Sequence, residues 1–181
     1  MTSTKYICLI GDIIKSSQTE DERLFNNINI VLQKLNSDLK PLVNFSRYAG
    51  DEFQGLLSIN QDPFNFIDFL EVNLIPLRFR VGIGIGGIVT QLRKTTYDMR
   101  GNAFLYARES IERAKKGRQF YFIKNNEDTS LLNSLLELIS FIKAQWSNEM
   151  IFRRYNLYRN YQSIYKVAKK EGVSPEAINK F

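Results

Sequence analysis

The sequence predicts an α+β fold followed by a small all-helical segment. Short apolar runs alternate with longer segments of helical periodicity as far as residue 123. Turn-forming residues separate these segments, and from about residue 126 onward only helical patterns remain. The 181 residues therefore divide into an α+β domain over residues 1–125 and a helical extension over residues 126–181.

The first four predicted elements are a strand, a helix and the two strands of a hairpin, over residues 4–14, 20–40, 43–48 and 53–59. The first strand is an apolar run that ends at Gly11-Asp12. The helix is predicted by apolar side chains at helical spacing: Leu24, Ile28, Val31, Leu35 and Leu39. The hairpin is predicted because two short β-rich runs flank the turn sequence Ala49-Gly50-Asp51-Glu52.

The next four predicted elements are a helix, a strand, a helix and a strand, over residues 63–74, 77–88, 101–116 and 119–123. Pro63 suits a first helical position, and Asp62 suits the cap before it. The strand at 77–88 contains Gly82, Gly84, Gly86 and Gly87, without the helix start or the Lys-Ser/Thr pair of a phosphate-binding loop. We therefore expect its glycines to admit the close approach of a neighbouring backbone.

The first six elements follow the order of the ferredoxin-like βαββαβ unit, an antiparallel sheet with helices on one face. In this topology the first strand is central and lies beside the hairpin, which brings Asp12 near Asp51 and Glu52. Converging carboxylates are typical ligands of Mg²⁺ or Mn²⁺. The alternative, on residue types alone, is that Asp12 caps a turn and Asp51 occupies a hairpin tip.

The segment after the first strand is a candidate phosphate site. Gly11, Lys15, Ser16 and Ser17 are expected to form a short turn whose backbone N–H groups face an anion. Together with a metal ion, such a turn would hold the phosphates of a nucleotide.

The composition excludes several kinds of chemistry. The chain has no histidine, which excludes Ser-His-Asp and Cys-His catalysis and His-ligated metals. Its single cysteine, Cys8, excludes a disulfide framework and is expected in the core of a cytoplasmic protein. No apolar run reaches 18 residues, so we expect no membrane partner. The net charge is +6, and residues 129–181 hold 8 basic against 4 acidic residues, which favours a polyanion partner for that segment.

Four motifs, in order along the chain, resemble those of nucleotidyl cyclases. Residues 49–53, A-G-D-E-F, are similar to the GGDEF signature of diguanylate cyclases, and residues 10–13, I-G-D-I, resemble the metal-binding strand of class III cyclases. Residues 80–87 resemble the glycine-containing strand of those enzymes, and residues 101–117 resemble their Asn/Arg helix. The resemblance implies a nucleotidyl cyclase-like sheet with covering helices.

More narrowly, the chain is similar to the SatD family, through I-G-D-I at 10–13, G-D-E-F-Q-G-L-L at 50–57 and G-N-A-F-L-Y-A-R-E at 101–109. This resemblance implies a cyclase-like domain joined to a C-terminal helix-turn-helix, and a homodimer, since cyclase-like sites often form between two subunits. The resemblance to the cyclases implies a site for Mg²⁺ or Mn²⁺ at Asp12, Ile13, Asp51 and Glu52. It also implies that Arg108 is a catalytic arginine. The alternative for Arg108 is an ion pair with Glu112 at i,i+4.

Two departures from the cyclase pattern favour binding over turnover. Phe104 stands where class III cyclases have a ribose-orienting Asn, and Ile14 stands where GGDEF proteins have a second Asp. We therefore expect a nucleotide- and metal-binding regulatory protein, coupled to DNA through the helix-turn-helix. One alternative is an active nucleotidyl cyclase or another nucleoside-triphosphate-processing enzyme. A second alternative is a catalytically silent dimerisation scaffold.

The last 21 residues predict a helix-turn-helix. Ala168, Gly172 and Ile178 are a small residue, a turn glycine and an apolar residue at suitable spacing, and Ser174-Pro175 suits the start of the second helix. The candidate DNA-binding residues are Lys169, Lys170, Ser174, Glu176, Asn179 and Lys180. The alternative is an ordinary helical hairpin with a solvated basic face. The apolar helix predicted over residues 131–146 links the two parts or pairs with its own copy.

Overall fold

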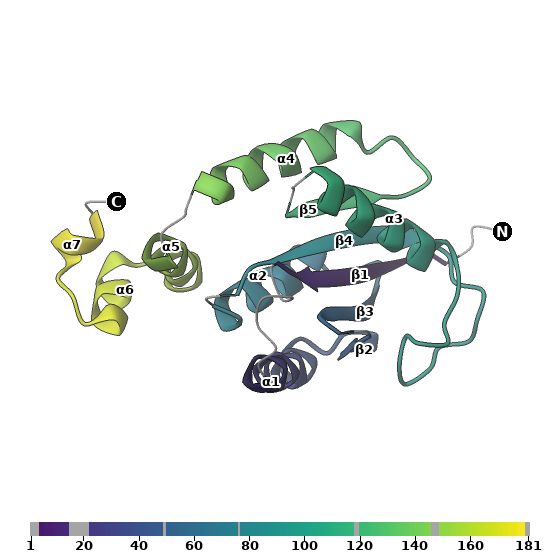
Figure 1. The fold of residues 1–181 in the computed structure, drawn as a ribbon, viewed down its shortest axis with the longest axis horizontal. Coiled ribbons are helices and arrows are strands. Elements are labelled where there is room, and N and C mark those ends of the chain that lie inside the picture. Colours follow the sequence, from purple (N-terminus) through teal and green to yellow (C-terminus); the bar gives the residue numbers. More distant parts are fainter. Residues whose placement is uncertain are drawn as a thin grey trace.

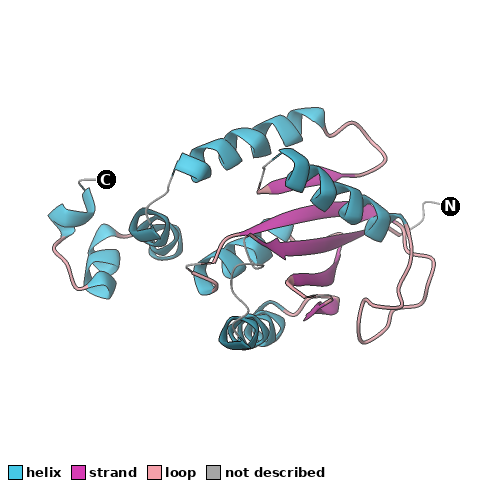
Figure 2. Cartoon of the chain, viewed as in Figure 1, coloured by secondary structure: helices cyan, strands magenta, loops and turns pink. Residues whose placement is uncertain are grey.

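The computed structural model describes residues 4–14, 22–48, 50–75, 77–117, 120–145 and 149–179. A mixed sheet lies at the centre, α3 covers one face, α1 and α2 cover the other, and three short helices project beyond it (Figures 1 and 2). The elements are β1 (Tyr6–Ile13), α1 (Glu22–Leu39), β2 (Val43–Arg47), β3 (Glu52–Ser58), α2 (Pro63–Asn73), β4 (Phe79–Gly86), α3 (Asn102–Gly117), β5 (Tyr121–Lys124), α4 (Ser130–Gln145), α5 (Glu149–Tyr161), α6 (Ile164–Glu171) and α7 (Pro175–Asn179).

The sheet order is β2-β3-β1-β4-β5. The first four strands are antiparallel to their neighbours, which confirms the predicted βαββαβ arrangement with β1 in the centre. The strand β5 is parallel to β4, so the complete sheet is mixed. The helix α3 makes the crossover between these two parallel strands, as parallel pairing requires.

Alternation along β1 assigns its side chains to two separate cores. Ile7, Leu9 and Ile13 belong to the larger core, which includes residues of α1 and α2. Cys8 and Ile10 belong to the smaller core beneath α3. Cys8 is 0% exposed, which confirms its expected core position, and burial raises the pKa of its thiol.

The glycines of β4 allow α3 to lie directly on the sheet. A Cβ atom at Gly82 would stand 2.4 Å from the carbonyl oxygen of Ala107, and one at Gly84 would stand 2.2 Å from that of Ala103. Both distances are far below any normal carbon–oxygen contact. The expected close approach of a neighbouring backbone is therefore confirmed, and the neighbour is α3.

The helix α2 begins as its sequence predicts. The side chain of Asp62 accepts a hydrogen bond from the backbone N–H of Phe64 at 2.9 Å, and Pro63 is the first helical residue. This cap satisfies one of the free N–H groups at the helix start.

The helix α4 covers the outer edge of β5. Asn133 accepts a hydrogen bond from the N–H of Ile123 at 2.9 Å and donates to its carbonyl at 2.8 Å. One heptad later, Ser140 Oγ accepts from the N–H of Phe120 at 3.0 Å. These two side chains satisfy backbone groups of an edge strand that would otherwise be open to another chain.

The C-terminal helices are held together by ion pairs that begin on α5. Arg153 Nη2 lies 2.8 Å from Glu171 Oε2 on α6, and Arg154 donates to the carbonyl oxygen of Ala177 on α7 at 3.2 Å. Arg159 of α5 forms a bidentate ion pair with Asp68 of α2, which attaches this unit to the sheet domain. These arginines therefore hold the helices in place, which the basic charge of the segment did not predict.

No helix in the described ranges is both long and apolar enough to cross a bilayer.

Candidate functional site

Three charged side chains form a row at the end of β1, on the face covered by α3. Asp12 lies opposite Glu52 of β3 and opposite Arg80 of β4 in the strand register. Arg80 Nη1 is 3.6 Å from Asp12 Oδ2. Register alone places these side chains together, because directly opposed residues of neighbouring strands point to the same face.

The helix α3 adds two cations to this row. Lys115 Nζ lies between the two carboxylates, 3.0 Å from Asp12 Oδ1 and 3.2 Å from Glu52 Oε1. Arg108 Nη1 bonds both oxygens of Glu52, at 2.8 and 3.0 Å. Arg108 thus pairs with Glu52, and Glu112 lies 3.9 Å from Lys115, so the i,i+4 alternative for Arg108 is wrong. We call Asp12, Glu52, Arg80, Arg108 and Lys115 the charged cluster.

Two members of the cluster, Asp12 and Lys115, have shifted pKa values. Burial raises the pKa of the Asp12 carboxyl, Lys115 lowers it, and the nearby charges of Asp51 and Glu52 raise it, for a net increase. Partial burial lowers the pKa of the Lys115 ammonium, but its hydrogen bonds to Asp12 and Glu52 outweigh that effect and raise it. Lys115 is therefore a stable cation at neutral pH.

The proposed metal ligands are only partly brought together. Asp12 and Glu52 converge, and Asp51 lies in the turn before β3, where its charge still raises the pKa of Asp12. The side chain of Ile13 is buried in the core on the opposite face, so only its carbonyl group could serve a metal. Among the described residues, no group of three or more Asp, Glu, Cys or His side chains is arranged to hold a metal ion. Lys115 also lies where a cation between the two carboxylates would sit, so the arrangement does not fit a divalent metal.

The prediction that Gly11 belongs to a phosphate-binding turn is wrong. β1 extends to Ile13, and Gly11 pairs with Phe53 and Val81 inside the sheet, so Gly11 is a strand residue. A Cβ at Gly11 would overlap the ring of Phe53 at 2.0 Å, which explains the glycine by packing. The other three residues, Lys15, Ser16 and Ser17, lie outside the described residues.

A cavity of about 510 Å³ lies beside the charged cluster. Arg108 lines its border, and its other walls come from β1, β3, the first half of α3 and the loop between β4 and α3. The aromatic side chains on its lining are Tyr48, Tyr97 and Phe104. Tyr48 and Tyr97 stack with their ring centroids 5.1 Å apart, which ties the β2–β3 hairpin to the loop.

Two buried polar side chains also line the cavity. Gln54 is 6% exposed and Thr96 is 1% exposed. In the part of the chain that the structure describes, the Thr96 hydroxyl has no hydrogen-bond partner. A buried hydroxyl without a partner is costly, and a hydrogen bond to a polar ligand or water in the cavity would remove that cost.

Sequence reasoning found Asp12, Glu52 and Arg108 but missed Lys115, Thr96 and Tyr97. Lys115 follows Arg108 by seven residues, which is two helical turns, so helix periodicity alone places both cations on one face. No local pattern marks Thr96 or Tyr97, because they reach the cavity through an irregular loop.

The C-terminal candidate residues lie on two short helices. Ser174 accepts a hydrogen bond from the N–H of Ala177 at 3.3 Å, and α7 begins at Pro175, so the predicted helix start is confirmed. Gly172 ends α6 with a positive φ of 68°, as the predicted turn requires. Lys169, Lys170, Glu176 and Asn179 are exposed, and Lys180 lies outside the described residues. Their role in DNA binding stays a prediction.

Fold and site together define an α+β protein with a mixed sheet and a charged cluster beside a polar and aromatic cavity. In sequence, residues 6–181 match the SatD family, so the chain belongs to that family. No curated protein matches the chain.

Solved structures of cyclase-type domains are similar to this chain at low sequence identity. A bacterial light-regulated adenylyl cyclase has 14% identity and a TM-score of 0.49, covering 66% of this chain and 75% of the other. The dimeric guanylyl cyclase domain of a fusion protein from the aquatic fungus Blastocladiella emersonii has 15% identity and a TM-score of 0.46, covering 60% and 74%. A microbial GGDEF domain studied with cyclic di-GMP has 16% identity and a TM-score of 0.43, covering 67% and 78%.

Proposed function

We propose that this protein binds a nucleotide or related phosphate compound in the cavity beside α3, and that the C-terminal helices carry the response to DNA. The observation that supports the ligand most directly is the unpartnered Thr96 hydroxyl on a cavity wall that also holds Arg108. Aromatic rings on the same lining suit a flat heterocycle, and the arginine suits a phosphate.

The cations of the cluster suit the charged end of such a ligand. The side chain of Arg108 is 40% exposed and already donates to both carboxylate oxygens of Glu52. The oxygens of a phosphate can take the place of the Glu52 carboxylate in these hydrogen bonds. Lys115 lies on the same helix face and contacts the same carboxylate. Because the arrangement does not fit a divalent metal, the proposed binding relies on the chain's own cations. The Mg²⁺ or Mn²⁺ requirement that the cyclase resemblance implies is the alternative, and a measurement in EDTA distinguishes the two.

Thermal unfolding with and without nucleotides tests the ligand site. A nucleotide at about 100 times its Kd is expected to raise Tm by roughly 5–10 °C, since it adds about 2.7 kcal/mol. The shift is expected to occur in EDTA, and to fall by at least half in Arg108→Gln. Arg113→Gln, an exposed arginine on the same helix, is the matched control and should keep the full shift.

Three outcomes would contradict this proposal. If no nucleotide changes Tm, the cavity is not a nucleotide site. If the shift needs Mn²⁺ and is lost in Asp12→Asn, the ligand is held by a metal and not by Lys115. If the nucleotide is consumed, product analysis would identify an enzyme, the alternative implied by the cyclase resemblance.

The proposed DNA contact is supported by exposed lysines on α6. Lys166, Lys169 and Lys170 are all exposed, in a segment whose net charge is positive. In Lys169→Ala/Lys170→Ala, the slope of log K against log salt for duplex DNA should fall by about two, since each phosphate contact contributes about 0.9. The control Lys94→Ala/Lys116→Ala removes the same charge from exposed positions elsewhere. Equal losses in the two double variants would show that only net charge matters, and would overturn a DNA site on α6.

A further inference from the structure

The outer face of α4 has no partner in the described structure. Its inner face packs on β5 through Asn133, Leu136, Ser140 and Lys143, which lie on one side of the helix. The rest of its surface carries large apolar side chains that are 37–76% exposed: Leu131, Leu132, Leu135, Leu138, Ile139, Phe141 and Ile142. In Figure 1 this helix lies along the upper border of the molecule with no element above it. We call these seven side chains the outer face of α4.

The spacing of this face is that of a helix-pairing surface. Leu131, Leu135, Leu138 and Ile142 are separated by four, three and four residues, the 3-4 repeat of a coiled-coil seam. Leu132 and Ile139 widen the seam on one side, and Phe141 widens it on the other. A helix whose inner side chains are already used by its own sheet needs no such repeat on its outer side for folding.

The exposed area of this face approaches the area that each partner buries in a stable dimer interface. The seven side chains expose on the order of 600 Å² per copy, against roughly 800 Å² that each partner buries in an interface of standard size. It also lies at the upper limit of the apolar patches found on soluble monomers.

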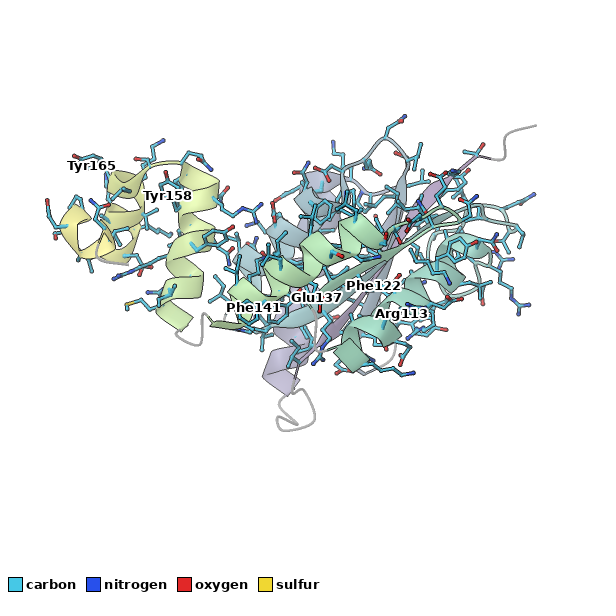
Figure 3. The ribbon with its side chains drawn as sticks, turned by 90° about the horizontal axis from the view of Figure 1, so that it is seen from above. Arg113, Phe122, Glu137, Phe141, Tyr158 and Tyr165 are labelled. Atoms are coloured by element: carbon cyan, nitrogen blue, oxygen red, sulfur yellow. The ribbon has the colours of Figure 1, made fainter. Side chains whose placement is uncertain are left out.

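The charges of α4 favour a second copy over a lipid surface. Helices that lie on membranes carry Lys and Arg along their polar face. In α4, Lys143 is the only basic residue, and it is buried against Glu71. The only acidic residue, Glu137, is exposed beside Phe141, which anionic lipids would disfavour (Figure 3). The repeat is also suited to self-association, because a two-fold axis places the same apolar face of both copies against each other.

We infer that the protein forms a homodimer through the outer face of α4. The inference does not depend on the proposed ligand, because no residue of the charged cluster or the cavity belongs to this face. It locates the interface on a helix that is separate from the ligand cavity. The two copies would thus bind nucleotide independently of dimer formation.

Light scattering coupled to size-exclusion chromatography tests this on the full chain. At tens of micromolar, the wild-type protein should elute with twice the monomer mass of 21.1 kDa. Leu135→Glu/Leu138→Glu should elute as a monomer, with its sheet signal in circular dichroism unchanged. Ile30→Glu is the matched control, since Ile30 is a 63% exposed apolar residue on α1, and it should remain dimeric.

A cross-linking variant provides a second measurement. Cys8 is 0% exposed, so in Leu138→Cys the introduced thiol is the accessible one among the described residues. Oxidation should link most chains into dimers, and Ile30→Cys should link few. Three results would each overturn the inference. The first is a monomeric wild-type protein, and the second is a dimer that persists in Leu135→Glu/Leu138→Glu. The third is binding to vesicles that is lost in that variant. The nucleotide-induced Tm shift should be retained in the monomeric variant, so failure here is distinguishable from failure of the ligand site.

Discussion

Replacing Lys143 with methionine is expected to lower the free energy of unfolding by about 3–5 kcal/mol, because it removes the nearest cation of a buried carboxylate and, among the described residues, leaves only Arg159, 4.0 Å away, as an ion-pair partner. Lys143 Nζ lies 2.6 Å from Glu71 Oε1 and 2.6 Å from Tyr121 Oη. The side chains of Lys143 and Glu71 are only 8% and 5% exposed. The loss corresponds to a fall in Tm on the order of 10 °C for a chain of this size. Chemical denaturation at pH 7 measures it.

The same variant should also show a distinct pH dependence. Burial raises the pKa of Glu71, and the charge of Lys143 opposes that increase, so removing Lys143 raises the pKa further. A carboxyl with a raised pKa contributes stability that is present below its unfolded value of about 4.3 and is lost as pH rises through the folded value. The destabilisation should therefore be smaller at pH 5 than at pH 8.

Two control variants distinguish the effect of an uncompensated buried charge from the effect of losing any lysine. Glu71→Gln/Lys143→Met removes both charges and should recover much of the lost stability. Lys116→Met removes an exposed lysine and should change stability by less than about 0.5 kcal/mol. If Lys143→Met is no worse than Lys116→Met, the ion pair is not buried as the structure has it.

The variant Gly84→Ala is expected to separate α3 from the sheet and to disrupt the charged cluster with it. The added methyl group would stand 2.2 Å from the carbonyl oxygen of Ala103 and 2.2 Å from the backbone nitrogen of Ala107. Backbone atoms cannot rotate away as side chains do, so we expect a loss at the upper end of overpacking costs, about 3 kcal/mol. The nucleotide-induced Tm shift should disappear as well, because Arg108 and Lys115 both extend from this helix.

A graded control lies on the same strand. At Gly86 the nearest atoms to an added Cβ are 2.9–3.0 Å away, so Gly86→Ala should cost less than half as much. Equal losses at both positions would contradict contact with α3 as the cause, since the lower flexibility of the unfolded chain would by itself make both variants more stable.

Local patterns predicted the elements well because each element follows from a short stretch of sequence. The apolar runs predicted β1 to β5, and the chain order predicted β1 as the central strand beside β3. The glycines of β4 predicted a close approach by another backbone. The parallel addition of β5 was not predicted, because strand direction at the end of a sheet depends on where α3 crosses.

The site was harder to predict because its contacts join distant residues. Glu52 and Lys115 are 63 positions apart and meet only because α3 lies on the glycines of β4. The use of Asn133 and Ser140 to satisfy the edge of β5 was also missed, since the apolar residues around them suggested pairing with another helix. In the structure α4 carries both sets: Asn133 and Ser140 face β5, and the exposed apolar side chains face away from it.

The direct contact between α3 and β4 has a consequence for how ligand preference can change. With almost no side-chain layer between helix and strand, α3 cannot slide or tilt to follow a ligand without backbone collisions. Positions 104, 108 and 115 on α3 therefore keep fixed places relative to the sheet. Under the proposed function, the ligand that the cavity accepts would then depend on which side chains occupy these three positions.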